Sequence, residues 1–350
     1  MSGREFLVTS VEAALLAREA HFAPRPAAQA PAEAEAGAPP LSAPDGGETW
    51  PNVHAPDAAR AASEAVQKLE PAGRRAVRAF LANPTAFAGL AILALVVAAA
   101  LAAPWLFPDD PLEMAGRPLL WPGQNPRFPL GTDALGRDVL AGLVHGARVS
   151  LLVGAVATVV GLLAGVLVGA TAGYFGGAVD DVLVKLIEIF QTVPGFILLI
   201  VLVAIAQPSV PAITLSIGAV SWPQVARLVR AQFRALKEKE FVAAARALGF
   251  GHGRIIFREI LPNALPPVIV LASVTVATAI LMESALSFMG LGDPNVVSWG
   301  SMIGTGRELL RTAWYLSAVP GLAIVLTVLA LNLIGDGLND ALNPHLAGEA

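Results

Sequence analysis

Residues 149–179 contain no charged side chain, and this stretch constrains the fold more than any other part of the chain. An α-helix needs about 20 consecutive apolar residues to cross the hydrocarbon core of a bilayer, so the stretch is long enough to span one. Of all 350 residues, 55% are hydrophobic and 14% are charged, whereas a soluble domain carries about 25% charged residues. The sequence therefore predicts an all-α polytopic membrane protein.

Six apolar runs are candidates for membrane spans. We expect about six transmembrane helices, at residues 86–106, 149–179, 182–205, 212–229, 260–285 and 312–334. Their orientation depends on Lys and Arg, because cytoplasmic loops are enriched in these residues. Arg74, Arg75 and Arg78 precede the first run, and the densest basic region follows the fourth, at residues 227–258. This distribution predicts that the N- and C-termini are both cytoplasmic.

The segments outside the spans differ in composition. Residues 1–72 are rich in Ala, Pro and Glu and bury too little apolar surface to offset the entropy of ordering, so we expect a disordered cytoplasmic tail. This tail is interpreted as a linker, with partner binding as the alternative. The other expected regions are a basic segment with the first span at 73–107, an extracytoplasmic segment at 108–148, a membrane core at 149–343 with a cytoplasmic loop at 230–260, and a C-terminal tail at 344–350.

Glycines repeat every four residues along the second predicted span. Gly161, Gly165, Gly169 and Gly173 therefore lie on one face of that helix. Small residues at this spacing let two helix backbones approach closely in lipid. We expect this face to pack on a neighbouring helix, within the chain or in a partner subunit.

A charged segment at residues 237–263 lies between two apolar runs. Phe241, Ala244, Ala245 and Leu248 recur at i, i+3, i+4 and i+7, so they share one face of a short helix. Gly249 follows, where a helix often ends on a residue with positive φ. So short a helix is not stable alone in water. We therefore expect it to need a partner surface.

Several kinds of chemistry are excluded by composition. The chain has no cysteine, its five histidines are scattered, and it contains no G-x-x-x-x-G-K-[ST] phosphate-binding loop. We expect no catalytic site, no metal and no cofactor in this chain. Any ATP-driven step would therefore receive its energy from another subunit, through the cytoplasmic loop.

The charged segment resembles the EAA loop of ABC-importer permeases. In that family a Glu-Ala-Ala triplet, a later glycine and an Ile-Leu-Pro mark the helix that couples to the ATPase. Ala243 stands where the triplet has Glu, and Glu240 lies nearby. The resemblance implies an ATPase-coupling segment made of Glu240, Phe241, Val242, Ala243, Ala244, Ala245, Arg246, Leu248, Gly249, Ile260, Leu261 and Pro262.

Two further phrases resemble the dipeptide/oligopeptide branch of these permeases. The phrase before the second span matches at Gly131-Thr132-Asp133, Gly136-Arg137-Asp138 and Arg148-Val149-Ser150. The phrase after the fifth span matches at Glu283, Ser284, Ser287-Phe288, Gly290-Leu291-Gly292 and Ser298-Trp299-Gly300. The resemblance covers the chain from about residue 72 to its end.

The resemblance implies a type I ABC importer permease fold in the bacterial cytoplasmic membrane, in the C-type position of a two-permease pair. The implied partners are a second homologous permease, two cytoplasmic ATPases that bind ATP and Mg²⁺, and an extracytoplasmic binding protein. Peptide is the first expected substrate, and nickel or another small solute is the alternative. A secondary transporter without an ATPase and a non-transporting scaffold are the rival functions.

Two polar residues are candidates for the translocation path. Gln191 and Glu283 lie within predicted spans, where a polar side chain is costly and often functional. For Gln191 the alternative is helix packing. For Glu283 the alternative is a helix-end acid at the outer interface.

Overall fold

A computed structural model describes residues 72–342 of the chain. Almost all of the expected N-terminal tail, and the C-terminal tail at 344–350, lie outside these residues. Within the described part every long element is a helix, and the β pairing there consists of two isolated bridges in the segment between α4 and α5. The all-helical class expected from the sequence is confirmed.

Four long helices are apolar enough to cross a membrane. They are α4 (Pro84–Leu106), α5 (Val139–Phe175), α11 (Leu261–Phe288) with the turns that precede it, and α13 (Tyr315–Leu342). A short helix, α3 (Ala72–Ala82), leads into α4. The side chain of Asn83 starts α4 by accepting a hydrogen bond from the N–H of Thr85, which satisfies one of the free donors at the helix start.

The expected third span is a broken helix. α6 (Gly177–Thr192) and α7 (Gly195–Ala206) meet at an angle of 82°. Val193 is extended because the following Pro194 disfavours a helical conformation there, and the chain changes direction at this point. The expectation of one continuous helix over 182–205 is therefore wrong.

The fourth expected span lies in α8 (Val210–Lys237). This helix is long, but it carries basic residues in its second half and is not among the helices that are long and apolar enough. By length and composition the described helices give four spans, or five if α6 and α7 form one. The expected number of six is not confirmed.

Several helix boundaries differ from the predicted ones. The second expected span, 149–179, lies within α5 only as far as Phe175, because Gly176 ends the helix with φ of +68°. Before this helix, Asp133 lies in a turn and Asp138 caps the start of α5. Two short elements precede α11, namely α10 (His252–Arg254) and the π-helical turn Ile255–Ile260. They continue into α11 without a break at Pro262.

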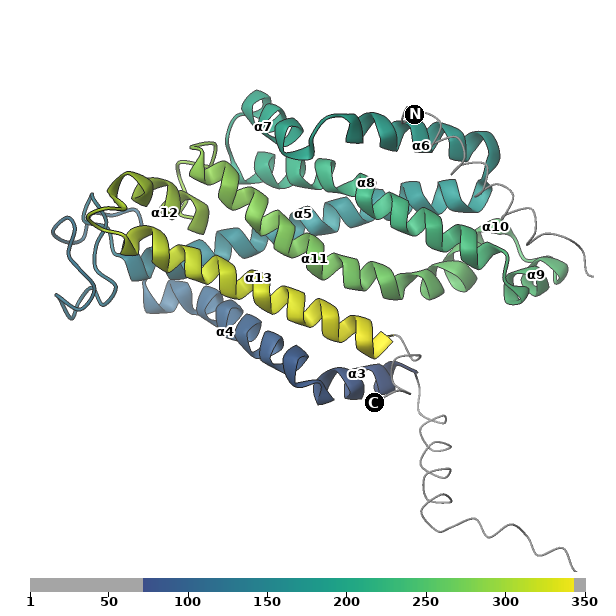
Figure 1. The fold of residues 1–350 in the computed structure, drawn as a ribbon, viewed down its shortest axis with the longest axis horizontal. Coiled ribbons are helices and arrows are strands. Elements are labelled where there is room, and N and C mark those ends of the chain that lie inside the picture. The colour runs from purple at the N-terminus through teal and green to yellow at the C-terminus, as the bar shows by residue number, and fades with distance from the viewer. Residues whose placement is uncertain (1–71, 343–350) are drawn as a thin grey trace, which may run out of the picture. The chain divides into compact units, whose positions relative to one another are not determined.

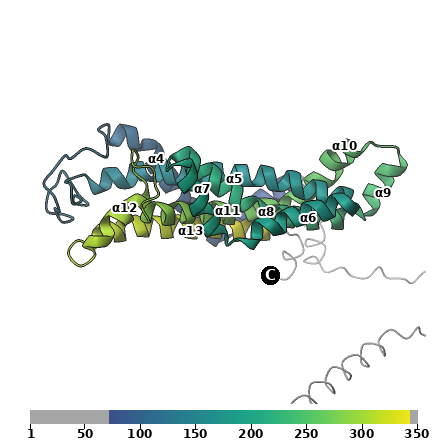
Figure 2. The same ribbon diagram turned by 90° about the horizontal axis from the view of Figure 1, so that it is seen from above.

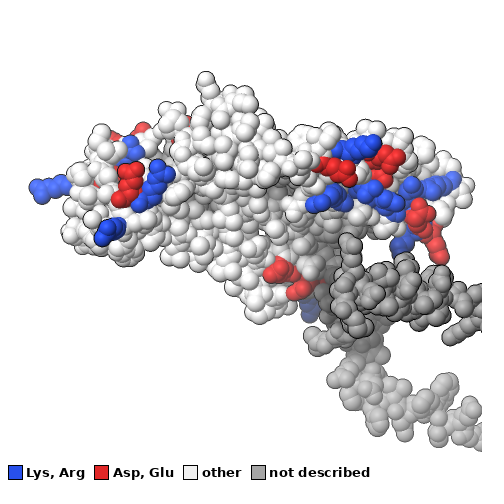
Figure 3. All heavy atoms as spheres, turned by 45° about the horizontal axis from the view of Figure 1, so that its top comes forward, with Lys and Arg blue, Asp and Glu red and all other residues white. Residues whose placement is uncertain are grey.

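The helices lie along a common direction, with connections at two ends (Figure 1). α5 packs against α8, α4 packs against α13, and α11 contacts α5, α8 and α13. α9 (Glu240–Ala247) and α10 lie at one end in both views (Figure 2). α12 (Trp299–Gly306), the 3₁₀ turn Arg307–Leu309 and residues 107–138 lie at the other end. Charged side chains gather at these two ends, and the middle of the face shown in Figure 3 is largely uncharged.

Candidate coupling surface and translocation cleft

The short helix α9 is anchored by one face. Val242 is fully buried and Ala245 nearly so, and both belong to an apolar cluster with Phe233 of α8 and Ile255 and Ile260 of the π-helical turn. The cluster continues into α5 and α11. Burial of these apolar side chains supplies the partner surface that so short a helix needs.

The face of α9 beside the anchored one is apolar and exposed. Phe241 is 40% exposed and Leu248 is 72% exposed, with Ala244 exposed between them. The sequence placed Phe241, Ala244, Ala245 and Leu248 on one face, but only Ala245 of these is buried. Periodicity identifies a face without indicating which side packs on the core. Here the face that contains Val242 packs on the core, and Phe241, Ala244 and Leu248 remain exposed.

Gly249 ends α9 in a left-handed conformation with φ of +78°. The N–H of Gly249 donates to the carbonyl of Arg246, and the N–H of Phe250 donates to the carbonyl of Ala245, at 2.9 and 3.1 Å. These two bonds form a Schellman motif, which satisfies carbonyl groups at the helix end. The ring of Phe250 then packs under the guanidinium of Arg254, 3.7 Å from the ring centre.

A hydrogen bond joins this segment to the core. The hydroxyl of Tyr174, at the end of α5, lies 2.8 Å from Nδ1 of His252. Of the remaining residues that the resemblance assigned to coupling, Ile260 is buried and Leu261 is half-buried. The exposed ones are Glu240, Ala243, Arg246 and Pro262. The contact between Tyr174 and His252 could not be predicted from local sequence patterns, because 78 positions separate the two residues.

The glycine stripe of α5 lies directly against α8. A Cβ atom added at Gly165 would lie 2.5 Å from Cβ of Val225, and one added at Gly173 would lie 2.7 Å from the carbonyl oxygen of Arg230. Gly161 and Gly169 meet Ser221 and Ala226 of the same helix in the same way. The sequence left open whether these glycines pack on a helix of this chain or on one of a partner subunit. In the structure all four lie against α8 of this chain.

A cleft of about 430 Å³ lies between the α6–α7 junction, α8 and α11. Gln191 lines it beside the break at Pro194. Its other polar lining residues are Ser221, Gln224, Arg227, Thr275 and Thr278. Arg227 was noted in the sequence only as part of a basic region, since its position on this cleft depends on the packing of three elements.

Glu283 does not line that cleft. Its side chain is 2% exposed and lies between α5, α11 and α12. The hydroxyls of Ser287 and Ser150 donate to its carboxyl oxygens at 2.7 and 3.2 Å, and Ser150 also accepts a hydrogen bond from the N–H of Trp299. Glu283 therefore lies near the end of α11, and its carboxyl is buried and linked by these hydrogen bonds to α5.

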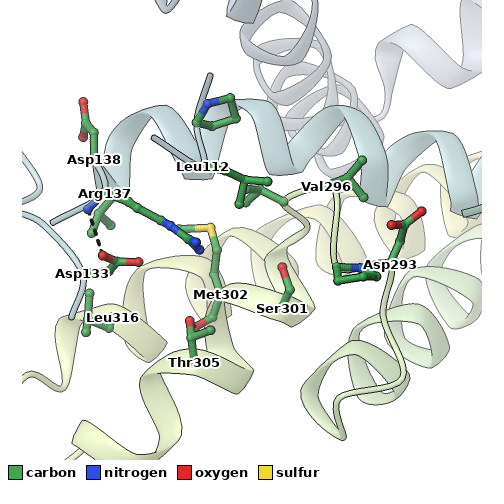
Figure 4. Close-up of a pocket in the computed structure, with 15 residues that line it drawn as sticks. Leu112, Asp133, Arg137, Asp138, Asp293, Val296, Ser301, Met302, Thr305 and Leu316 are labelled. Atoms are coloured by element: carbon green, nitrogen blue, oxygen red, sulfur yellow. Dashed lines mark hydrogen bonds between the residues drawn. The ribbon is translucent and has the colours of Figure 1, made fainter. Parts of the chain in front are cut away.

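A second, smaller pocket of about 190 Å³ lies at the other end of the molecule (Figure 4). Asp133, Arg137 and Asp138, which the sequence singled out as a motif, line it together with Asp293. Burial raises the pKa of Asp138 above its ordinary value. Burial also acts on Asp293, but hydrogen bonds from the N–H groups of Asn295 and Val210 outweigh it and lower the pKa of that carboxyl.

The family model of the "binding-protein-dependent transport system inner membrane component" matches residues 161–348. The model of the "N-terminal TM domain of oligopeptide transport permease C" matches residues 72–122. The first match alone covers more than half of the chain, and together the two include the first apolar helix and the α9 segment.

Curated relatives match most of the chain. A di/tripeptide transport system permease protein of Pseudomonas aeruginosa is 40% identical over 78% of this chain and 92% of the relative. An oligopeptide transport system permease protein of Haemophilus influenzae is 37% identical over 81% of this chain and 93% of the relative. A solved inward-facing structure of the MetNI methionine ABC transporter aligns with 58% of this chain and 96% of that chain, at 21% identity and a TM-score of 0.49.

The family assignment depends on the sequence matches alone. They confirm the resemblance to ABC-importer permeases and the expected location in the bacterial inner membrane. The chain belongs to the family of binding-protein-dependent transport system inner membrane components, the permease subunits of ABC importers.

Proposed function

We propose that this chain forms half of the translocation path of an ATP-driven importer of peptides. A second, homologous permease supplies the other half, and an extracytoplasmic binding protein delivers the substrate. Two cytoplasmic ATPases bind ATP and Mg²⁺ and hydrolyse the nucleotide. The relatives named as di/tripeptide and oligopeptide permeases support peptide as the substrate.

The exposed apolar face of α9 is the observation that carries this proposal. Phe241, Ala244 and Leu248 form an exposed stripe beside the face of α9 that Val242 and Ala245 fix to the core. Removing such a stripe from water favours association with a partner protein. The small side chain of Ala244 leaves room for that partner between the two larger ones.

The anchoring of α9 explains how a motion of the ATPases reaches the membrane. Val242 and Ala245 share a cluster with residues of α5, α8 and α11, so a displaced α9 shifts the packing of all three helices. Packed cores respond by moving between discrete arrangements rather than by continuous deformation. Nucleotide binding at the ATPases and access to the cleft are then coupled through one packed element.

The test is co-purification and reconstitution of the complete complex. Wild-type chain is isolated from its native membrane in mild detergent, and the co-eluting proteins are identified. The complex is then placed in proteoliposomes, and ATP-dependent uptake of a labelled dipeptide is measured. Elution of a P-loop ATPase and a second permease, with peptide uptake, is the expected result.

A matched pair of substitutions tests the α9 surface itself. Leu248→Asp adds a charge to the exposed stripe, and we expect roughly tenfold less ATPase to co-purify, because burying an unpaired carboxylate against an apolar partner surface is costly. Leu310→Asp changes a leucine that is 52% exposed beyond the 3₁₀ turn at the opposite end, and it should retain the ATPase. Equal retention by both variants would contradict the role of α9.

Two other results would redirect the proposal. ATP-dependent uptake of Ni²⁺ without uptake of peptides would identify a nickel importer. Uptake driven by an ion gradient in the purified chain, without an ATPase, would identify a secondary transporter.

A further inference from the structure

Arg227 differs from the arginines that follow it on α8. One turn later, Arg230 forms a two-bond ion pair with Asp180, through Nε at 2.5 Å and Nη2 at 2.7 Å. Arg234 lies 3.8 Å from the same carboxylate. Within residues 72–342, no carboxylate lies within ion-pair distance of Arg227, whose side chain is exposed on the cleft.

The residues that line the cleft place no negative charge beside Arg227. Among the lining residues, Arg227 carries the single charge, and the polar groups around it are amides and hydroxyls such as Gln191, Gln224 and Thr275. Glu283, the carboxylate nearest in sequence to the α11 lining, is buried elsewhere against serine hydroxyls. The cleft therefore attracts anionic groups and repels cations.

A guanidinium binds a carboxylate with two parallel hydrogen bonds, which gives both strength and orientation. Arg227 lies at the end of the fourth expected span, and a charged side chain that lines a cleft without an ion-pair partner is available to bind and orient an anionic ligand. Neutral amides and hydroxyls beside it can pair with peptide N–H and C=O groups. These properties fit a small solute that carries a free carboxylate next to amide groups.

We propose that Arg227 is a specificity-determining residue of the cleft, where it binds the carboxylate of the transported substrate. The substrate class is accordingly one with a free carboxylate, such as a short peptide with an unmodified C-terminus, and not a bare metal cation. This inference rests on the proposed function, and it assigns the substrate recognition to one side chain of this permease.

The test compares two substrates in the reconstituted complex. ATP-dependent uptake is measured for a dipeptide and for the same dipeptide with a C-terminal amide, with the binding protein in excess. The variants are Arg227→Gln, Arg227→Lys and, as the matched control on the same helix but outside the cleft, Arg234→Gln. Because the binding protein is identical throughout, its own preference cancels when the acid-to-amide uptake ratio is compared between variants.

We expect Arg227→Gln to lower uptake of the free acid about tenfold, the scale of one lost charge-assisted hydrogen bond, and to change uptake of the amide by less than about twofold. Arg227→Lys should retain most uptake of the acid, since it keeps the charge. Arg234→Gln should leave the ratio unchanged. An equal loss for acid and amide in Arg227→Gln, or no loss for either, would overturn the assignment.

A chemical rescue separates charge from folding. The chain has no native cysteine, so Arg227→Cys introduces a unique thiol into it. After assembly, a reagent that attaches an aminoethyl group by a disulfide should restore the acid-to-amide ratio, and one that attaches a neutral methylthio group should not. Equal effects of both reagents would contradict the proposal.

Assembly itself is also informative. Failure of Arg227→Gln and Arg227→Cys to assemble, with normal assembly of Arg227→Lys, would assign Arg227 to an intersubunit ion pair and overturn substrate binding. If the wild-type complex imports no peptide, the proposed function fails. If the wild-type complex imports peptide and the ratio is unchanged in Arg227→Gln, only the role of Arg227 fails.

Discussion

Glycine serves opposite purposes in the α5–α8 interface and in the α9 segment. At Gly165 and Gly173 an added Cβ would overlap atoms of α8, so these glycines permit close contact. At Gly249 and Gly251 an added Cβ would meet no atom within 4 Å. Glycine is favoured at position 249 for another reason, because the backbone there is left-handed, with φ of +78°. One region is a tightly packed pair of helices, and the other is an open surface held by local backbone geometry.

We expect the largest effect from a substitution that fills the close contact in the α5–α8 interface. Gly165→Leu places a side chain into space already occupied by Val225 and by the carbonyl of Trp222. Overpacking costs about 1–3 kcal/mol when neighbours can shift, and here backbone must shift as well. We expect a lower midpoint of thermal unfolding in detergent and little assembled complex. Ala155→Leu, on an exposed position of the same helix, should have a much smaller effect on the midpoint.

A second effect is expected at the end of α9. Gly249→Val forces a β-branched residue into a left-handed conformation, at a cost of at least about 1–2 kcal/mol. Since the site is open, folding and assembly should persist, while α9 is displaced from its position on the core. We expect ATP hydrolysis to continue and uptake per ATP to fall several-fold. Gly251→Val is the control, because Gly251 has φ of −69° and equal space.

Normal uptake by Gly249→Val at normal expression would mean that the backbone at this position does not contribute to coupling. A loss of uptake in Gly251→Val of the same size would point to bulk on the segment rather than to the left-handed conformation. The two measurements together distinguish strain from crowding.

The rules that succeeded from sequence alone were local. A four-residue glycine repeat and a glycine after a short helix each depend on neighbours in the chain, and both positions have the geometry that the pattern indicates. Predictions that required tertiary contacts were less accurate. The stripe on α9 was identified but its buried side was not, and the burial of Glu283 depends on Ser150, which is 133 positions away.

The break between α6 and α7 is an intermediate case. Pro194 was visible in the sequence, but the largely apolar residues on both sides of it in 182–205 favoured one continuous span. Proline within a long helix is compatible with a kink or a complete break, and the choice depends on what packs around it. Here the broken ends border the cleft at Gln191, which sequence periodicity cannot reveal.

A smaller effect is expected where the two regions meet. Tyr174 follows Gly173 on α5, and its hydroxyl bonds His252 beyond α9. Tyr174→Phe keeps the ring and removes this hydrogen bond, worth about 0.5–1.5 kcal/mol. We expect faster hydrogen exchange in residues 240–260, with little change in α5 and α8. A double-mutant cycle with His252→Ala should be non-additive, and strictly additive effects would show that the pair does not interact.

The smallest effect is expected at Ala243, on the open side of α9. Its side chain is exposed, so Ala243→Glu, which restores the acid that this family carries at the start of the triplet, meets no obstacle within the chain. Glutamate and alanine also differ little in helix propensity, by a few tenths of a kcal/mol. We expect unchanged thermal stability, with ATPase co-purification equal to or greater than that of the wild type. Loss of the ATPase from a stably folded Ala243→Glu variant would mean that this position contacts the partner closely and that the open face of α9 is matched to alanine rather than to the acid.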